Sequence, residues 1–195
     1  MNRADRQAWN WCRTLADLGE MTARWLEGDT ASQPDYAPGC GPDPETAPLI
    51  AVLAAANRAG YLTASSQPGC RETSGGTSWT QCAAVSGFAT EADATRLAEL
   101  ATACGLAVMA RQAPRWRSRR RDQIPVTIRD GLDFTWFGVV RSRWSLRDGW
   151  TGYGECHPDA VAAVCGAWQV AIIDPEWGRE DSPVWGVLRA FGGAR

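Results

Sequence analysis

The stretch from Trp79 to Arg111 constrains the fold most strongly, because it has the pattern of a strand, a helix and a second strand in succession. Residues 79–88 (WTQCAAVSGF) alternate between apolar and polar residues as a strand does. Thr90 then caps a helical pattern that ends at Gly105. LAVMAR follows as another strand, so the run predicts two strands of one sheet bridged by a packed helix.

The rest of the chain adds helices and strands in mixed order. Thr14 and Asp17 form a capping-box pattern ahead of a helix that Gly28 ends. Further helices are predicted over residues 3–12, 46–58, 157–167 and 182–191, and further strands over 61–65 and 168–174. IPVTIRD and DFTWFGVV flank Gly131 and predict a hairpin, whereas SQPGCRETSGGTS (66–78) and SLRDG (145–149) are interpreted as a polar loop and a polar turn.

This order predicts an α+β fold with a single mixed, mainly antiparallel sheet and helices chiefly on one face. Residues 1–45 are expected to form an N-terminal helical arm with a Pro/Gly-rich loop, and residues 46–195 the α+β domain, the two making one compact unit. The loop at residues 30–46 (TASQPDYAPGCGPDPET) is the segment expected to be flexible or to cover a ligand.

Composition excludes several classes of protein. All 20 basic residues are arginine, as a GC-rich gene would produce, and the formal net charge of −2 gives no overall field that favours nucleic acid or an anionic membrane. The N-terminus lacks the apolar segment of a secretory signal, and no stretch has the roughly 20 apolar residues of a membrane span, so we expect a cytoplasmic protein. Seven cysteines and a single histidine, His157, predict no disulfide framework, no metal site and no cofactor.

The first candidate site is the polar loop that follows the strand at residues 61–65. Hydroxyl and amide groups gather at the end of this strand, where ligands often bind in open sheets. Glycines nearby would allow a ligand to approach the backbone. The candidate ligand-binding residues here are Ser65, Ser66, Gln67, Trp79 and Gln81, with a plain surface turn as the alternative.

The second candidate site is the acidic segment DPEWGRED, directly after the apolar strand VAII. Asp174, Trp177 and Arg179 are candidate ligand-binding residues. Asp174 and Glu176 are also candidates for general acid and base. The alternative is a structural turn in which Arg179 pairs with a neighbouring carboxylate.

The third candidate is the basic segment between Arg111 and Arg121, which surrounds Trp116. Guanidinium groups pair with phosphates and tryptophan stacks on bases, so this segment is a candidate for a nucleic-acid or phosphate contact. A solvated basic loop is the alternative. The residues concerned are Arg115, Arg117, Arg119, Arg120 and Arg121.

Two further patterns have mainly structural interpretations. Glu155-Cys156-His157 is a poor catalytic pair, since adjacent side chains point apart, and His157 before Pro158 is typical of a helix start. Five tryptophans are expected to build the core, and Trp144 and Trp150 to be partly exposed. The five are Trp79, Trp136, Trp168, Trp177 and Trp185.

Several phrases resemble a family of uncharacterised proteins common in Streptomyces, other actinobacteria and their phages. They are TLADLGEMTARWLEGDTASQP, NRAGYLTASSQPG, WTQCAAVSGF and WQVAIIDPEWGRED. The resemblance implies an actinobacterial or actinophage origin and no particular activity.

Four hypotheses for function follow. The favoured one is a small intracellular binding protein for a polar ligand, including a nucleotide, held where the SQPG and DPEWGRED loops meet around a shared hollow. The others are an interaction or inhibitor protein from a phage or mobile element, with an exposed aromatic patch; a hydrolase or transferase that uses Asp174 or Glu176; and a nucleic-acid binder through Arg115–Arg121. The possible partners are therefore a small polar ligand, a protein or a nucleic acid, and no membrane is expected.

Overall fold

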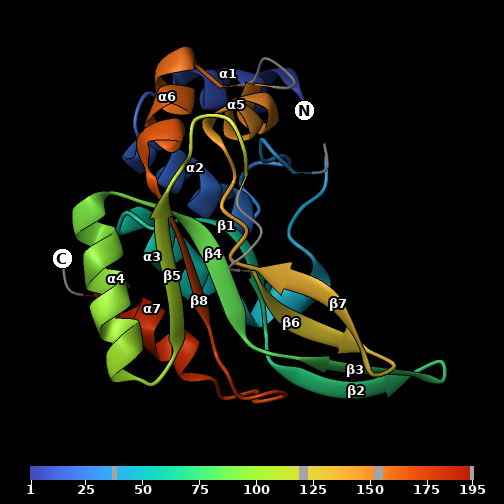
Figure 1. Cartoon of the computed structure of the whole chain (residues 1–195). Coiled ribbons are helices and arrows are strands. Elements are labelled where there is room, and N and C mark those ends of the chain that lie inside the picture. Colours follow the sequence, from blue (N-terminus) through green and yellow to red (C-terminus); the bar gives the residue numbers. More distant parts are fainter. Residues whose placement is uncertain (37–38, 119–122, 152–155, 194–195) are drawn as a thin grey trace.

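A computed structural model of the chain describes residues 1–36, 39–118, 123–151 and 156–193. Within these ranges helices and antiparallel strands are mixed along the chain, which confirms the α+β class (Figure 1). The strands form two four-stranded sheets rather than the expected single sheet, and every pairing is antiparallel.

The first sheet, sheet A, has the order β1-β4-β8-β5. Its strands are β1 (Leu62–Gln67), β4 (Ala84–Ala89), β8 (Trp168–Ile173) and β5 (Ala107–Gln112). As predicted, β4 and β5 belong to one sheet and are connected by a helix, and β8 lies between them. Along one row of this sheet, Ser65 pairs with Ser86, Ser86 with Ala171, and Ala171 with Met109.

Sheet B has the order β2-β3-β6-β7 and consists of two hairpins. Its strands are β2 (Cys70–Ser74), β3 (Thr77–Gln81), β6 (Ile124–Arg129) and β7 (Leu132–Phe137). Asp130 and Gly131 have φ of 49° and 80°, and Gly75 and Gly76 have 57° and 82°, as the two-residue turns of tight hairpins require. The predicted hairpin at Gly131 is confirmed, whereas the expected loop at 66–78 is wrong, because Gly75-Gly76 turns most of it into β2 and β3.

The chain passes directly from one sheet to the other in two places. After two residues, β1 continues into β2, and β3 continues into β4 after Cys82 and Ala83. A single antiparallel ribbon therefore leaves sheet A and becomes half of sheet B. A small second core fills the junction and contains Cys82, Ala84, Val126 and Ile173, with Trp177 packed against it.

Three helices pack on one face of sheet A (Figure 1). They are α3 (Ile50–Arg58), which follows the 3-10 helix η1 (Pro44–Leu49), α4 (Glu91–Ala103) and α7 (Pro183–Gly193). The predicted Thr90 cap of α4 is present, since its hydroxyl accepts from the Asp93 backbone N–H at 3.2 Å. This face therefore carries the main core, and the opposite face of the sheet is left for other segments.

The remaining helices lie at the other end of sheet A (Figure 1). They are α1 (Arg3–Trp11), α2 (Leu15–Leu26), α5 (Arg143–Thr151) and α6 (Pro158–Gly166). The capping box of Thr14 and Asp17 is confirmed, as is the start of α6, where His157 is the N-cap and Pro158 the first helical residue. Helix α5 occupies the segment interpreted as a polar turn.

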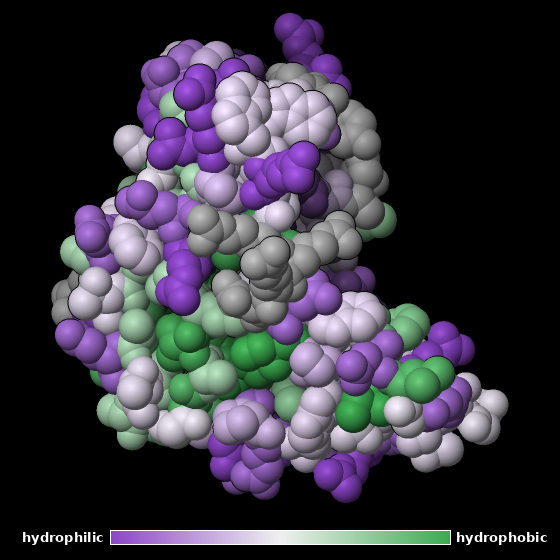
Figure 2. Space-filling view, viewed as in Figure 1, coloured by the Kyte–Doolittle hydropathy of each residue, from purple (hydrophilic) through white to green (hydrophobic). Residues whose placement is uncertain are grey.

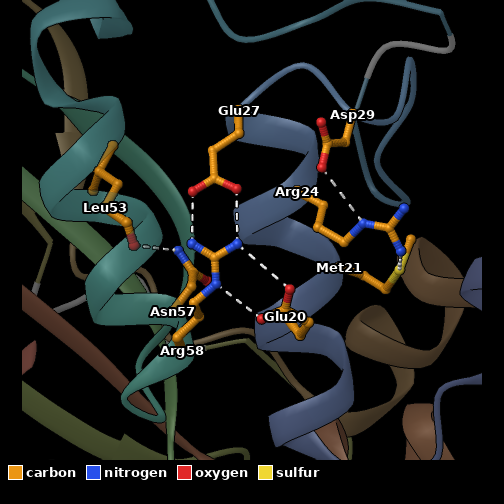
Figure 3. A network of polar contacts seen from close by, with 8 residues as sticks. All are labelled: Glu20, Met21, Arg24, Glu27, Asp29, Leu53, Asn57 and Arg58. Atoms are coloured by element: carbon orange, nitrogen blue, oxygen red, sulfur yellow. Dashed lines mark hydrogen bonds and ion pairs between the residues drawn. The ribbon is translucent and has the colours of Figure 1, made fainter.

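Helix α2 is fixed to α3 by close contact and by charge (Figure 3). Gly19 lies against Asn57, where a Cβ would overlap the backbone carbonyl oxygen. The guanidinium of Arg58 binds Glu27 through two hydrogen bonds of 2.6 and 2.7 Å and Glu20 through two of 2.9 and 3.4 Å. These contacts hold the N-terminal helices in a defined position relative to β1.

The tryptophans are distributed differently from the expectation. Trp185 is buried, but Trp79, Trp168 and Trp177 are only partly buried and Trp136 is 41% exposed. Trp144 is exposed, whereas Trp150 is buried, because α5 turns it toward Phe88. Trp9 and Trp25 of the N-terminal helices are buried in the same core cluster as α3 and α7.

Candidate functional site

The two predicted loops lie side by side at the junction of the sheets. The backbones at Gly69 and Arg179 are so close that a Cβ on Gly69 would overlap the Arg179 carbonyl oxygen. The Gly178 N–H donates to the Gln81 carbonyl at 2.9 Å, and the Arg71 guanidinium donates to the Trp177 carbonyl at 3.2 Å. The two loops therefore meet as the sequence predicted, through direct protein contacts. Of the predicted ligand-binding residues, Ser65 and Ser66 line the cavity described below, whereas Gln67, Trp79, Gln81, Asp174, Trp177 and Arg179 do not.

Asp174 is the centre of the DPEWGRED loop. It is fully buried and accepts from Arg179 Nε and Nη2 at 2.8 Å, from the Ser182 hydroxyl at 2.6 Å and from the Glu176 N–H at 2.9 Å. Burial alone would raise the pKa of Asp174, but the hydrogen bonds from Arg179, Ser182 and the Glu176 backbone outweigh it and lower the pKa. The carboxylate thus fastens the loop to the start of α7.

Glu176 and Arg179 complete this loop network. The exposed Glu176 carboxylate accepts from Arg179 Nη1 at 2.8 Å. The hydrogen bond to Asp174 is the largest of the effects that raise the pKa of Arg179. All three guanidinium nitrogens bind carboxylates of the same loop, an arrangement that serves loop structure.

Gln67 bridges the two sheets. Its side chain is buried, and Nε2 donates to the carbonyls of Cys82 and Val126, both at 2.9 Å. The amide oxygen accepts from the Thr127 hydroxyl at 3.3 Å. With its donors and acceptor bound to protein, Gln67 stabilises the junction between β1, β4 and β6.

The other two candidate residues of this region, Trp79 and Gln81, lie in β3 of sheet B. The Gln81 amide donates to the Cys70 thiol at 3.2 Å. The Trp79 ring packs edge-on against Phe134 and lies 4.9 Å from the guanidinium carbon of Arg129. Beside them, β7 exposes the apolar residues Leu132, Phe134 and Trp136.

A cavity of about 480 Å³ lies on the face of sheet A opposite α3, α4 and α7, and Ser65 and Ser66 line it. In the view of Figure 2, apolar residues gather in a hollow over the strands of this sheet. The floor of the cavity is formed by three strands and Met109. Its residues are Thr63, Ala64, Ser65 and Ser66 of β1, Ser86, Gly87 and Phe88 of β4, and Gln169, Val170 and Ala171 of β8.

One wall of the cavity comes from the N-terminal part of the chain. Trp25 of α2 lines it and donates its indole N–H to the Cys40 carbonyl at 3.1 Å. The Tyr36 ring packs edge-on against Trp25, with centroids 5.3 Å apart. Gln33, Asp35, Pro42, Asp43 and Thr46 complete this wall, so the loop at residues 30–46 lies beside the cavity.

The opposite wall is the end of β7 and the linker that follows it toward α5, residues 136–141. Gln169 of β8 holds this linker, since its amide oxygen accepts from the Arg141 N–H and its Nε2 donates to the Arg141 carbonyl, each at 2.8 Å. The Arg141 guanidinium forms an ion pair with Asp35 and donates to the Ser145 carbonyl at 2.9 Å. The Asp35–Arg141 pair thereby connects the two walls.

The floor is fixed from beneath by a buried amide. Asn57 of α3 accepts from the Thr63 N–H at 2.9 Å and donates to the Thr63 hydroxyl at 2.7 Å and to the Leu53 carbonyl at 2.8 Å (Figure 3 shows the bond to Leu53). Beside Thr63 the pairing of β1 with β4 shifts register. Gly87 lies there, because a Cβ at this position would overlap the Leu62 carbonyl. The hydroxyl-bearing end of β1 is therefore held in place before any ligand arrives.

The cavity combines flat aromatic rings with hydroxyl, amide and carboxylate groups. Trp25, Tyr36, Phe88, Trp136 and Phe137 supply the rings. Burial raises the pKa of Tyr36 to about 12, with further contributions from a hydrogen bond to Asp43 and from nearby charges, so the phenol is neutral at physiological pH. Of the residues predicted from the sequence, Ser65, Ser66 and the 30–46 loop line the cavity. The segment 136–141 was not predicted, because its role depends on a contact 106 residues away.

The basic segment lies away from these loops. Arg115 and Arg117 are exposed beside Trp116. Arg119, Arg120 and Arg121 fall outside the described residues, as does Glu155. In the described parts of the chain, no helix is long and apolar enough to cross a membrane.

Fold and cavity together define an α+β protein in which a cavity lies on one face of sheet A, between two walls. The chain belongs to the family described as Domain of unknown function (DUF6919), whose model matches residues 4–193. No curated protein matches the chain by sequence.

Proposed function

We propose that this protein binds a small polar molecule that carries a flat ring, in the cavity on the open face of sheet A. The observation that carries the proposal is the cavity of about 480 Å³, a volume within the usual range of small-molecule sites. Its lining provides rings for stacking and hydroxyl groups for hydrogen bonds. The Asp35–Arg141 ion pair and the hydrogen bonds between Gln169 and the Arg141 backbone hold the two walls in place. They support the proposal, since a preorganised site loses less entropy when a ligand binds.

The charges beside the cavity indicate the class of ligand. Asp35, Asp43 and Arg141 are the charged residues in its lining, and Arg141 is already paired with Asp35. No guanidinium among the described lining residues is therefore left for a phosphate. We infer a neutral or cationic ligand, so that within the nucleotide class a nucleoside binds better than its phosphate ester.

Thermal unfolding in the presence of nucleosides tests this proposal. The probes are adenosine, guanosine, cytidine and uridine, each compared with its 5′-monophosphate. At roughly 100 times the dissociation constant, a bound ligand adds about 2.7 kcal/mol, which raises the Tm of a chain of this size by about 5–10 °C. We expect a rise with at least one nucleoside and a smaller rise with its monophosphate.

A pair of serine variants provides the control. Ser86→Phe fills the cavity from its floor, whereas Ser78→Phe places the same ring on an exposed position of β3. The rise in Tm should be lost in the first variant and kept in the second. An equal response of both variants would contradict binding in this cavity.

The source organism determines where a natural ligand should be sought. The use of arginine in place of lysine, which is typical of a GC-rich gene, and the family resemblance favour an actinobacterium or its phage. Purification from such a host is therefore the way to retain a bound molecule.

A further inference from the structure

Two segments far apart in the sequence form one basic and aromatic surface. The start of α5 is hydrogen-bonded to the 114–118 segment, through the Arg143 N–H to the Pro114 carbonyl at 2.9 Å and the Ser142 N–H to the Ser118 hydroxyl at 3.1 Å. The residues between Pro114 and Ser118 therefore lie beside the first turn of α5. We call this the Arg-Trp surface and define it as Arg115, Trp116, Arg117, Arg143, Trp144 and Arg147.

Both tryptophans on the Arg-Trp surface are open to solvent. Trp116 is 71% exposed and Trp144 is 65% exposed, which is unusual for the largest apolar side chain. The Arg115 guanidinium lies over the Trp116 ring at 4.9 Å, as cation–π pairs do. The two exposed indoles therefore lie on neighbouring segments, and apart from the face of Trp116 that Arg115 covers they are accessible for stacking.

The four arginines of the surface are also exposed. Within the described ranges none of them forms an ion pair with a carboxylate. Asp148 is the exposed carboxylate on the same helix, one turn after Trp144. The local charge is therefore positive in a chain whose net charge is −2.

Helix α5, which carries half of this surface, is packed against the core. Leu146 and Trp150 are buried and fix α5 to the core, and Trp150 packs edge-on against Phe88. The Ser142 hydroxyl accepts from the Ser145 N–H at 3.2 Å and caps the helix. The positions of Trp144 and Arg147 along this helix are thus set by the fold.

We propose that the Arg-Trp surface binds single-stranded nucleic acid. Guanidinium groups pair with backbone phosphates, and indole rings stack on bases whose faces are free. A duplex would satisfy the arginines but not the tryptophans, because its bases are already stacked on one another. An acidic protein would leave the stacking faces without a specific role, so the combination favours a single strand. An anionic membrane, whose interface also accepts exposed indoles, is the competing outcome of the test.

Fluorescence anisotropy with a labelled oligothymidine of about 20 nucleotides tests this inference, with a duplex of equal length for comparison. We expect tighter binding of the single strand and a steep loss of affinity between roughly 50 and 300 mM NaCl. Tighter binding of the duplex would overturn the proposal. So would binding to vesicles of phosphatidylcholine and phosphatidylserine without binding to the oligonucleotide.

Substitutions separate stacking from charge. Trp144→Ala and Trp116→Ala should each weaken binding roughly fivefold to a hundredfold, and Trp144→Phe and Trp116→Phe should weaken it much less, because a ring remains. Arg143→Gln and Arg147→Gln together should reduce the slope of log affinity against log salt by about 1.4. Arg189→Gln, at an exposed position of α7, is the matched control and should change neither affinity nor slope.

Equal affinity in the alanine and phenylalanine variants, or an equal effect of Arg189→Gln, would refute a site on this surface. The cavity variant Ser86→Phe should bind the oligonucleotide as the unmodified protein does. The two proposals can therefore fail separately.

Discussion

Asp174 and Arg179 form a two-pronged ion pair in which Nε and Nη2 of the arginine each donate to a different carboxylate oxygen at 2.8 Å. The Asp174 side chain is fully buried, whereas the Arg179 side chain is 29% exposed. The pair therefore anchors a surface loop to the end of the buried strand β8, and Ser182 extends it to α7.

Asp174→Asn should lower the free energy of unfolding by about 2–4 kcal/mol, because it weakens charge-assisted hydrogen bonds and leaves Arg179 without its buried partner. Urea denaturation measures the change. Glu176→Gln, which removes the exposed carboxylate bound to the same guanidinium, should change the midpoint little. Equal effects of the two substitutions would show that burial of Asp174 does not matter.

The same pair predicts how stability depends on pH. The pKa of Asp174 is lower in the folded protein than its ordinary value of 3.8. Its contribution is thus complete above the unfolded pKa and is lost as the pH falls through the lower folded pKa. Denaturation curves between about pH 2 and pH 6 should show a steeper acid loss for the unmodified protein than for Asp174→Asn. Parallel profiles would contradict this assignment.

Gln67→Leu should destabilise the protein by about 2–3 kcal/mol, because the carbonyls of Cys82 and Val126 each lose one donor inside the sheet junction and Val126 keeps only the Cys82 N–H. Gln112→Leu, at an exposed position of β5, is the matched control. Chemical denaturation compares the two. A Gln67 variant as stable as the control would mean that the amide does not hold the sheets together.

Gly69→Ala should cost about 1–3 kcal/mol, since the new methyl group would meet the backbone carbonyl of Arg179 and the two loops would have to separate. Gly41→Ala introduces the same atom where no other atom lies within 4 Å and should be nearly neutral. Thermal unfolding distinguishes the two. Equal melting temperatures would show that the loops do not touch at Gly69.

The cysteines should react at very different rates. Cys40 and Cys104 are exposed, whereas burial raises the pKa of Cys12 and Cys82 to about 11, with smaller contributions from carboxylates. A disulfide reagent at about pH 8 should therefore modify Cys40 and Cys104 in a fast phase, which Cys40→Ser with Cys104→Ser abolishes. A fast phase that survives both substitutions would place a reactive thiol elsewhere.

Local signals in the sequence predicted local structure well. The Thr14–Asp17 capping box, the Thr90 cap and the Asp130-Gly131 hairpin all follow from short-range chemistry, and the structure confirms them. The Gly75-Gly76 turn carried the same kind of signal, since paired glycines between alternating residues predict a hairpin. Its first strand, CRETS, is polar and mostly exposed, so the segment lacks the apolar alternation that marks a strand in the sequence.

Long-range arrangement was harder to predict. Alternation along β1 and β3 does not reveal that the ribbon leaves one sheet for another at Pro68 and Cys82. The sequence predicts that the two loops meet. It does not show that Gln67 binds a backbone carbonyl at the junction, or that Arg179 binds Asp174 of its own loop. The Asp35–Arg141 pair joins residues from two loops and has no local signature.

The most direct test of the central claim is native mass spectrometry of the protein purified from an actinobacterial host. We predict a small molecule bound in a one-to-one ratio to the unmodified protein and to Ser78→Phe, and absent from Ser86→Phe. Retention of the same molecule by Ser86→Phe, or its absence from all three proteins, would contradict a ligand site on the open face of sheet A.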